Sequence, residues 1–172
     1  MDDFILQFAI NKKIDNANNC SIKLNKLDCY LDYINQNRHL INNRPITFQH
    51  GDFHIGNTLI DTNGNIVIID FNRHDLGDPW EEFNRIPFSV RVSEAYASGC
   101  IDGYFKNEIP ETFFALLALY ISVNQISSLP WALKFGESEI NFTKDMSNQI
   151  LYWYDDFKMI IPRWYTTINK II

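Results

Sequence analysis

The stretch that decides the fold runs from Thr47 to Pro79 and reads TFQHGDFHIGNTLIDTNGNIVIIDFNRHDLGDP. It holds four of the seven glycines of the chain, three of its four histidines and five aspartates. Two apolar runs, NTLID (57–61) and NIVIIDF (65–71), are joined by an Asn-Gly turn, which is a strong signal for a β-hairpin. Because both runs are apolar on both faces, we expect helices to bury this hairpin.

Three polar side chains flank the predicted hairpin. Asp52 precedes the first strand, Asn57 begins it, and Asp70 follows the second strand. Because a hairpin reverses the chain, the start of one strand lies beside the end of the other, and we expect the three side chains to converge. Two carboxylates and an amide oxygen suit Mg²⁺, which takes few protein ligands and leaves room for phosphate oxygens.

The spacing of these residues matches a phosphoryl-transfer site. His50, Asp52 and Asn57 have the spacing of the kinase sequence H-R-D-x-x-x-x-N, with Gly51 at the arginine position. Asp70, followed by Phe71 and Asn72, stands where the kinase D-F-G would stand. These residues therefore favour a magnesium and phosphate site over unrelated polar loops.

The two strings HGDFHIGN (50–57) and IIDFNRHDLGDP (68–79) resemble the aminoglycoside phosphotransferase and choline kinase family, the small-molecule branch of the kinase-like fold. The longer strings QHGDFHIGN and DFNRHDLGDPWEEFNR are similar to one bacterial subgroup of phosphotransferases. The resemblance implies an α+β, mostly α fold: the C-terminal lobe of the protein-kinase-like fold, with a small catalytic β-hairpin packed among helices. Residues 1–172 would form this lobe as a single domain.

The resemblance also implies roles and cofactors. Asp52 would accept or orient the proton of a substrate hydroxyl, and Asn57 and Asp70 would hold Mg²⁺ on the phosphates of ATP or GTP. His50 and His54 would support the loop. The acceptor would be a small molecule, and aminoglycosides, choline-like amines, amino alcohols and sugars all remain open.

The N-terminal lobe of that family carries a glycine-rich phosphate loop and a strand lysine paired with a helix glutamate. No G-x-G-x-x-G occurs here, because the glycines fall at positions 51, 56, 64, 77, 99, 103 and 136. We therefore expect a C-terminal lobe without the N-terminal nucleotide-binding lobe. Such a truncated chain would have little activity alone.

Acidic side chains around the predicted site are candidates for binding a cationic acceptor. Asp75, Glu81 and Glu82 follow the second strand, and Asp155 and Asp156 lie near the C-terminus. For the glutamates and for the C-terminal pair, a solvated helix face is the simpler interpretation. Asp78, followed by Pro79 and Glu81, predicts the capped start of a helix.

The remaining sequence is mostly helical in pattern. Helices are predicted over residues 4–13, 24–41, 92–105, 110–128 and 137–160. The Asn-rich segments DNANN (15–19) and NNRP (42–45) are predicted to be loops, and ITFQ (46–49) a short strand. The sequence SSLP (127–130) is expected to end the fourth helix.

Composition narrows the class of protein further. The net charge of −6 argues against a nucleic-acid or anionic-membrane partner, and the longest apolar run, FFALLALYI, is too short to span a bilayer. Three cysteines without C-x-x-C spacing favour neither a disulfide framework nor a structural zinc site. The N-terminus does not resemble a signal peptide, so a cytoplasmic location is expected.

Two other functions stay open. The chain could be a non-catalytic pseudo-kinase or assembly module, a homodimer formed through the apolar face that would otherwise meet the N-terminal lobe. His50, Asp52 and His54 could instead be the metal ligands of a metallohydrolase. Gly51 and Gly56 argue against this, because they favour a loop over the helical H-E-x-x-H geometry.

Overall fold

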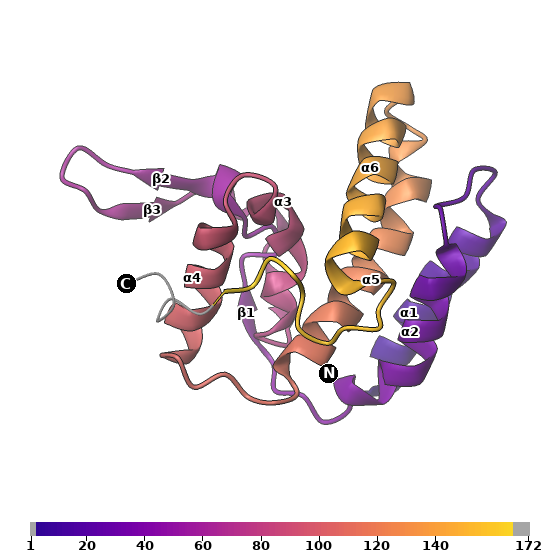
Figure 1. Cartoon of the computed structure of the whole chain (residues 1–172), viewed down its shortest axis with the longest axis horizontal. Helices are drawn as coiled ribbons and strands as arrows, with labels where there is room; N and C mark the ends of the chain where they lie inside the picture. The colour runs from indigo at the N-terminus through magenta and orange to yellow at the C-terminus, as the bar shows by residue number, and fades with distance from the viewer. Residues whose placement is uncertain (1–2, 167–172) are drawn as a thin grey trace. The chain divides into compact units, whose positions relative to one another are not determined.

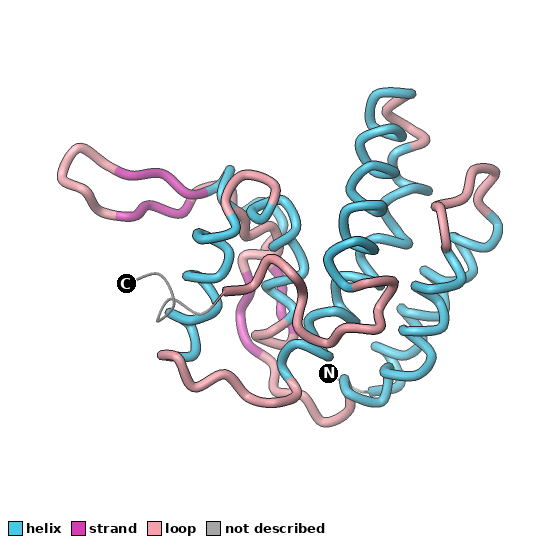
Figure 2. Tube along the Cα trace, viewed as in Figure 1, coloured by secondary structure: helices cyan, strands magenta, loops and turns pink. Residues whose placement is uncertain are grey.

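The computed structural model describes residues 3–166, which are mostly helical with two short pairs of antiparallel strands (Figure 1, Figure 2). This composition agrees with the predicted mostly α fold. The elements, with η marking 3₁₀ helices, are α1 (Asp3–Asn19), α2 (Leu27–Asn37), η1 (Arg38–Ile41), β1 (Thr47–Gln49), η2 (Ile55–Asn57), β2 (Thr58–Ile60), β3 (Ile66–Ile68), η3 (Phe71–Arg73), β4 (Asp75–Gly77), η4 (Glu81–Arg85), α3 (Ile86–Val90), α4 (Glu94–Phe105), α5 (Phe113–Ala132) and α6 (Glu137–Tyr154).

The described residues fall into two compact units. The first holds residues 3–44 and 114–162, and the second holds residues 45–113 and 163–166. The first unit is entirely helical, whereas both strand pairs lie in the second. The predicted site residues belong to the second unit, except for the acidic candidates Asp155 and Asp156, which belong to the first.

The helices of the first unit are joined by buried polar contacts as well as by an apolar core. Tyr30 of α2 is fully buried, and its hydroxyl donates to the carbonyl of Ser147 in α6 at 2.9 Å. The hydroxyl of Tyr33 donates to the carbonyl of Ala115 in α5 at 3.0 Å. Phe157 stacks on Tyr33 with ring centroids 4.8 Å apart. These contacts fix α2 against both C-terminal helices.

Two predicted boundaries in the first unit were wrong. The segment DNANN is the last part of α1, not a loop. Ala17 is buried there, and the ammonium group of Lys23 donates to the carbonyls of Ala17 and Asn18. Burial and this carbonyl cap stabilise a helical turn that the local sequence disfavours. The predicted helix 24–41 is α2 followed by the 3₁₀ turn η1.

The two C-terminal helices also end at other residues than the sequence predicted. α5 continues through Pro130 to Ala132, because a proline in the last turn removes a single backbone hydrogen bond. α6 ends at Tyr154 rather than near residue 160. The three residues that follow, Asp155, Asp156 and Phe157, have φ angles of 50°, 54° and 62°, which a helix cannot continue through.

α5 is long and apolar enough to cross a membrane by length and composition alone. Of its most apolar window, 72% is buried within the protein. A mostly buried apolar helix is what the core of a globular protein requires.

The predicted hairpin is present in the second unit. β2 and β3 are antiparallel, with Thr58 opposite Ile68 and Ile60 opposite Ile66. Asp61 closes the turn, since its Oδ1 accepts from the backbone N–H groups of Asn63 and Asn65 at 2.8 Å each. The Asn-Gly signal therefore identified this hairpin correctly.

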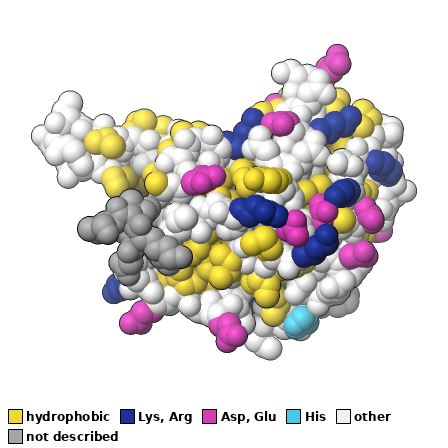
Figure 3. All heavy atoms as spheres, in the orientation of Figure 1, with side chains coloured by type: hydrophobic (Ala, Val, Ile, Leu, Met, Phe, Trp, Pro, Cys, Tyr) yellow, Lys and Arg dark blue, Asp and Glu magenta, His cyan; other side chains and the backbone are white. Residues whose placement is uncertain are grey.

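The prediction that helices bury this hairpin was wrong. Ile60 is 75% exposed and Ile66 is 70% exposed, and Leu59 and Val67 are also exposed. The hairpin projects from the rest of the second unit, and apolar side chains show on its surface (Figure 1, Figure 3). Within residues 45–113, the chain turns away after β3 instead of covering the strands.

The other strand pair joins β1 to β4, with Thr47 opposite Gly77 and Gln49 opposite Asp75. β1 matches the predicted strand, whereas β4 was missed because its three residues, DLG, carry no β signal of their own. A Cβ at Gly77 would lie 2.8 Å from the end of the Gln49 side chain, so a larger residue there would have to displace that side chain.

The helical region after β4 begins less regularly than predicted. The carboxylate of Asp78 accepts from the backbone N–H of Trp80 at 3.0 Å, but the turn that follows is the 3₁₀ helix η4. Its buried Phe83 packs edge-to-face on Phe113, with ring centroids 5.6 Å apart. Phe105 packs in the same way on Phe113 at 4.7 Å. This aromatic cluster anchors η4 and α4 beneath the site.

Candidate active site

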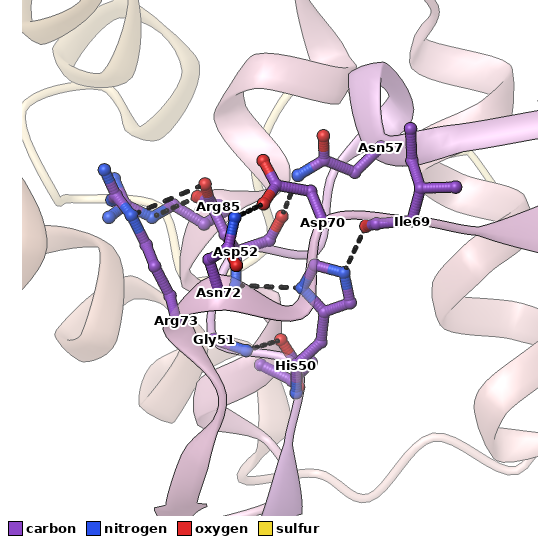
Figure 4. Close-up of polar contacts among 10 residues, drawn as sticks. His50, Gly51, Asp52, Asn57, Ile69, Asp70, Asn72, Arg73 and Arg85 are labelled. Atoms are coloured by element: carbon purple, nitrogen blue, oxygen red, sulfur yellow. Dashed lines mark hydrogen bonds and ion pairs between the residues drawn. The ribbon is translucent and has the colours of Figure 1, made fainter.

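The hairpin register brings two of the predicted site residues together. Beyond the β2–β3 pairs, the backbone N–H of Ile69 donates to the carbonyl of Asn57 at 3.0 Å. Asn57, at the end of η2, therefore lies opposite Ile69 and next to Asp70. Figure 4 shows the side chains of Asn57 and Asp70 on the same side of the loop as Asp52. The expected convergence of the three residues is present.

The side chains of Asn57 and Asp70 are each held by one hydrogen bond. The Nδ2 of Asn57 donates to the carbonyl of Asp52 at 2.9 Å, so its Oδ1 is left as an acceptor. Asp70 has a φ of +65°, and its Oδ1 accepts from the Nδ2 of Asn72 at 2.7 Å. One amide oxygen and one carboxylate oxygen thus stay open to a ligand, judged over the described residues.

His50 ties the loop to the end of β3. Its Nδ1 accepts from the backbone N–H of Asp52 at 3.2 Å, and its Nε2 lies 2.8 Å from the carbonyl of Ile69. A ring whose Nδ1 accepts carries its proton on Nε2, so we assign the Nε2 contact as a donated hydrogen bond. The ring also packs on Phe71, with centroids 4.4 Å apart.

Glu82 binds the backbone of the same loop. Its Oε2 accepts from the backbone N–H of His50 at 2.6 Å, and its Oε1 accepts from that of Gly51 at 3.0 Å. The sequence offered Glu82 as a contact to a cationic acceptor. Both carboxylate oxygens of Glu82 accept from the backbone of the loop, and a contact to an acceptor stays a prediction.

Gly51 is required by a close backbone approach. Its φ is +78°, and a Cβ at this position would lie 2.0 Å from the carbonyl oxygen of Arg73. The glycine therefore lets η3 pack against the loop that carries Asp52. This explains why a glycine occupies the position that corresponds to the kinase arginine.

Two arginines approach the carboxylate of Asp52. The Nε of Arg85 lies 3.3 Å from Oδ1, and the Nε of Arg73 lies 3.8 Å from Oδ2. The side chains of Asp52 and Arg85 are each 20% exposed, whereas that of Arg73 is 53% exposed. Burial lowers the pKa of Arg85, and the charge of Asp52 opposes this shift.

His54 lies on the far side of the loop, where its Nδ1 accepts from the backbone N–H of Gly56 at 3.0 Å. Its ring packs on Phe88 with centroids 5.6 Å apart, and burial lowers its pKa. Two of the other acidic candidates lie elsewhere in the second unit: Asp75 is exposed in β4, and Glu81 begins η4. Asp155 and Asp156 follow α6 in the first unit.

A comparison with known families decides the identity. Residues 6–113 match the phosphotransferase enzyme family (APH). The chain belongs to this phosphotransferase family. The predicted family is therefore confirmed, together with the mostly helical kinase-like fold. No curated protein sequence matches the chain.

A solved phosphotransferase structure has a similar fold. It is the crystal structure of a thermostable mutant of aminoglycoside phosphotransferase APH(4)-Ia, in a ternary complex with AMP-PNP and hygromycin B. The TM-score is 0.54 at 23% sequence identity, over 73% of this chain and 42% of that chain. The chain thus spans less than half of the length of that enzyme.

A cavity of about 610 Å³ lies beside the loop that carries His50. Its lining is mainly apolar and includes Phe48, His50, Phe71, Cys100 and Tyr104. Asp52, Asn57 and Asp70 do not line it. The cavity therefore borders the supporting side of the loop and not the side that carries the three polar groups.

The metallohydrolase hypothesis finds no support in the geometry. Both His50 and His54 use Nδ1 to accept a backbone N–H group within their own loop. Residues 3–166 contain no group of three His, Cys, Asp or Glu side chains placed to hold a metal ion.

The sequence interpretation missed Arg73 and Arg85. Each follows an asparagine in the strings DFNR and EEFNR, but nothing in that local pattern says that η3 and η4 converge on Asp52. The sequence did contain one signal for Arg73, because this cation lies three residues after Asp70, a predicted magnesium ligand.

Proposed function

We propose that this chain is the catalytic lobe of a Mg²⁺-dependent kinase that transfers the terminal phosphoryl group of ATP or GTP to a hydroxyl of a small molecule. The observation that carries the proposal is the convergence of Asp52, Asn57 and Asp70, which the β2–β3 register produces. Phosphoryl transfer needs positioning and charge neutralisation more than covalent chemistry, so this short set of groups suffices.

The residues fit a magnesium site. The Oδ1 of Asn57 and the second carboxylate oxygen of Asp70 are hard oxygen donors on adjacent positions of one hairpin end. Mg²⁺ is commonly held by one or two such groups together with substrate phosphates. When bound, the ion would neutralise charge on the phosphates of the donor.

Asp52 would act on the acceptor. Its carboxylate would take the proton of the acceptor hydroxyl as the new bond between that oxygen and phosphorus forms and the bond to the leaving nucleoside diphosphate breaks. His50, through its contact with the backbone N–H of Asp52, would keep the loop in place during this step. Arg85 would hold the carboxylate in one orientation.

The identity of the donor has one line of support. The similar aminoglycoside phosphotransferase was crystallised with AMP-PNP, which favours ATP, and GTP is the alternative. The hygromycin B in that structure belongs to that enzyme. At 23% identity it does not name the acceptor of this chain.

Thermal unfolding with Mg-ATP and Mg-GTP tests the proposal, with Asp70→Ala as the variant and Asp75→Ala as the control. A nucleotide at one hundred times its Kd would stabilise the fold by about 2.7 kcal/mol. We expect a stabilisation that requires Mg²⁺, disappears in Asp70→Ala and persists in Asp75→Ala. A stabilisation that is independent of Mg²⁺ or of Asp70 would contradict the assignment.

A second proposal is a non-catalytic homodimer that forms through the β2–β3 hairpin. The exposed apolar side chains of Leu59, Ile60, Ile66 and Val67 favour it, because an uncovered two-stranded hairpin is marginally stable in water. Sedimentation of the chain beside Ile60→Lys tests it. A dimer that the substitution dissociates would support this proposal, and a monomer for both would remove it.

A further inference from the structure

Of the two arginines beside Asp52, Arg85 is mostly buried, whereas Arg73 is about half exposed. Within residues 3–166, neither Arg73 nor Arg85 donates a side-chain hydrogen bond. The Nε of Arg85 is buried, and although it lies 3.3 Å from Asp52, it lacks hydrogen-bond geometry. The other contact of Arg85 is its Cζ over the ring of Phe88, 5.9 Å from the centroid.

This arrangement leaves donors without acceptors. A guanidinium group offers five N–H donors in a planar fork, so the two arginines offer more donors than one carboxylate can satisfy. A buried donor without an acceptor, such as the Nε of Arg85, destabilises the folded protein. The missing acceptor would be an oxyanion, since guanidinium forks bind carboxylate and phosphate oxygens in pairs.

The charges around Asp52 also favour the binding of an oxyanion. Two guanidinium groups, Arg73 and Arg85, lie near the carboxylate of Asp52, and the carboxylate of Asp70 contacts Asn72 instead. In Figure 4, the two arginines lie on one side of Asp52, and Asn57 and Asp70 lie on its other side. If Asp70 binds a magnesium ion, the two positive charges of the arginines are balanced by only one negative charge, that of Asp52. An anion beside Asp52 would restore the balance.

We propose that Arg73 and Arg85 form an oxyanion site beside Asp52. Arg73, the more exposed of the two, contacts the oxyanion and is a catalytic residue. Arg85, the less exposed, positions the carboxylate of Asp52. The place of this site in the reaction rests on the proposed phosphoryl transfer. The oxyanion is either the phosphoryl group in transfer or an anionic group on the acceptor, and a cationic acceptor group is disfavoured there.

NMR of the arginine side chains tests the site directly. The Nε–Hε signals of the ¹⁵N-labelled chain are followed during titration with inorganic phosphate, with L-lactate and with choline chloride, all at matched ionic strength. We expect saturable shifts of the Arg73 and Arg85 signals with an oxyanion and none with choline. Shifts with phosphate alone indicate the transferred phosphoryl group, and equal shifts with lactate indicate an acceptor anion.

Two variants separate the site from general electrostatics. Arg73→Gln should weaken phosphate binding by about tenfold or more, whereas Arg91→Gln, at an exposed arginine of the same unit, should leave it unchanged. Backbone amide spectra verify that both variants fold. Absence of saturable shifts, or equal loss of binding in the two variants, would overturn the proposal.

The phosphate titration tests the oxyanion site separately from the proposed phosphoryl transfer. Asp70→Ala should remove the Mg²⁺-dependent nucleotide effect and keep the phosphate shifts at the arginines. If phosphate binds at the arginines but no nucleotide effect depends on Asp70, the proposed function fails and the oxyanion site stands. If the nucleotide effect is present and the arginine signals do not respond, the oxyanion site fails alone.

Discussion

The two strand pairs of the second unit have the same length and mostly exposed side chains, but they differ in the polar contacts around them. β1–β4 carries the loop of Asp52 and is held by polar contacts, in which Glu82 binds two backbone N–H groups and Gln49 reaches the carbonyl of Asp78. β2–β3 is almost wholly apolar, yet its side chains are exposed. The polar pair is thus the fixed part of the site, and apolar composition alone did not predict burial.

Glycine substitutions should give the largest difference in stability between the Asp52 loop next to β1 and the turn between β2 and β3. Gly51→Ala places a Cβ 2.0 Å from the carbonyl oxygen of Arg73 at a φ of +78°, and we expect a loss of about 3 kcal/mol or more. Gly64→Ala, in the β2–β3 turn, has a φ of +86° but meets no atom within 4 Å. It should lose only about 1–2 kcal/mol.

Urea unfolding of the two glycine variants measures this difference. Equal losses would mean that the contact between η3 and the Asp52 loop does not restrict the chain as the structure indicates.

The Glu82 contact should be next in size. Glu82→Gln keeps one acceptor oxygen and replaces the other with a donor, which faces a backbone N–H group. We expect a loss of about 1–3 kcal/mol in urea unfolding and faster hydrogen exchange at His50 and Gly51. Glu81→Gln, one residue earlier in η4, is the control and should change exchange at neither amide. Unchanged exchange in Glu82→Gln would contradict the role of this carboxylate.

The loop should also show a pH dependence that the β2–β3 pair lacks. Burial lowers the pKa of His54 below its usual value of 6.5, so the unfolded chain binds a proton more readily than the folded one. The stability from neutral His54 is present above pH 6.5 and is lost as the pH falls from 6.5 through the folded pKa. Melting temperatures between pH 7.5 and 5 should fall less steeply in His54→Gln than in the exposed control His39→Gln. The same slope in both variants would assign the effect to other groups.

The smallest effect is expected at the exposed hairpin. Ile60→Ala should change stability by about 0.5 kcal/mol or less, because this side chain is 75% exposed. Ile101→Ala, at a fully buried position of α4, should cost about 2–5 kcal/mol. Urea unfolding compares them. A large loss at Ile60 in this chain would show that the hairpin is covered in solution, as a dimer would require.

The sequence predicted those features that follow from local chemistry. The Asn-Gly turn identified the hairpin, and chain reversal predicted that Asn57 lies beside Asp70. The contacts that depend on distant segments were not predictable in this way. Arg85 reaches Asp52 only because the aromatic cluster around Phe83 places η4 beneath the loop. The last turn of α1 depends on Lys23, beyond its own helix.

The central claim is that Asn57 and Asp70 form one end of a magnesium–nucleotide site. Substoichiometric Mn²⁺, added with ADP to the ¹⁵N-labelled chain, tests it most directly, because the paramagnetic ion broadens nearby NMR signals. The account predicts selective broadening at Asn57 and Asp70 that requires ADP and is lost in Asp70→Ala. Broadening confined to other acidic positions, such as Asp155 and Asp156, would contradict it.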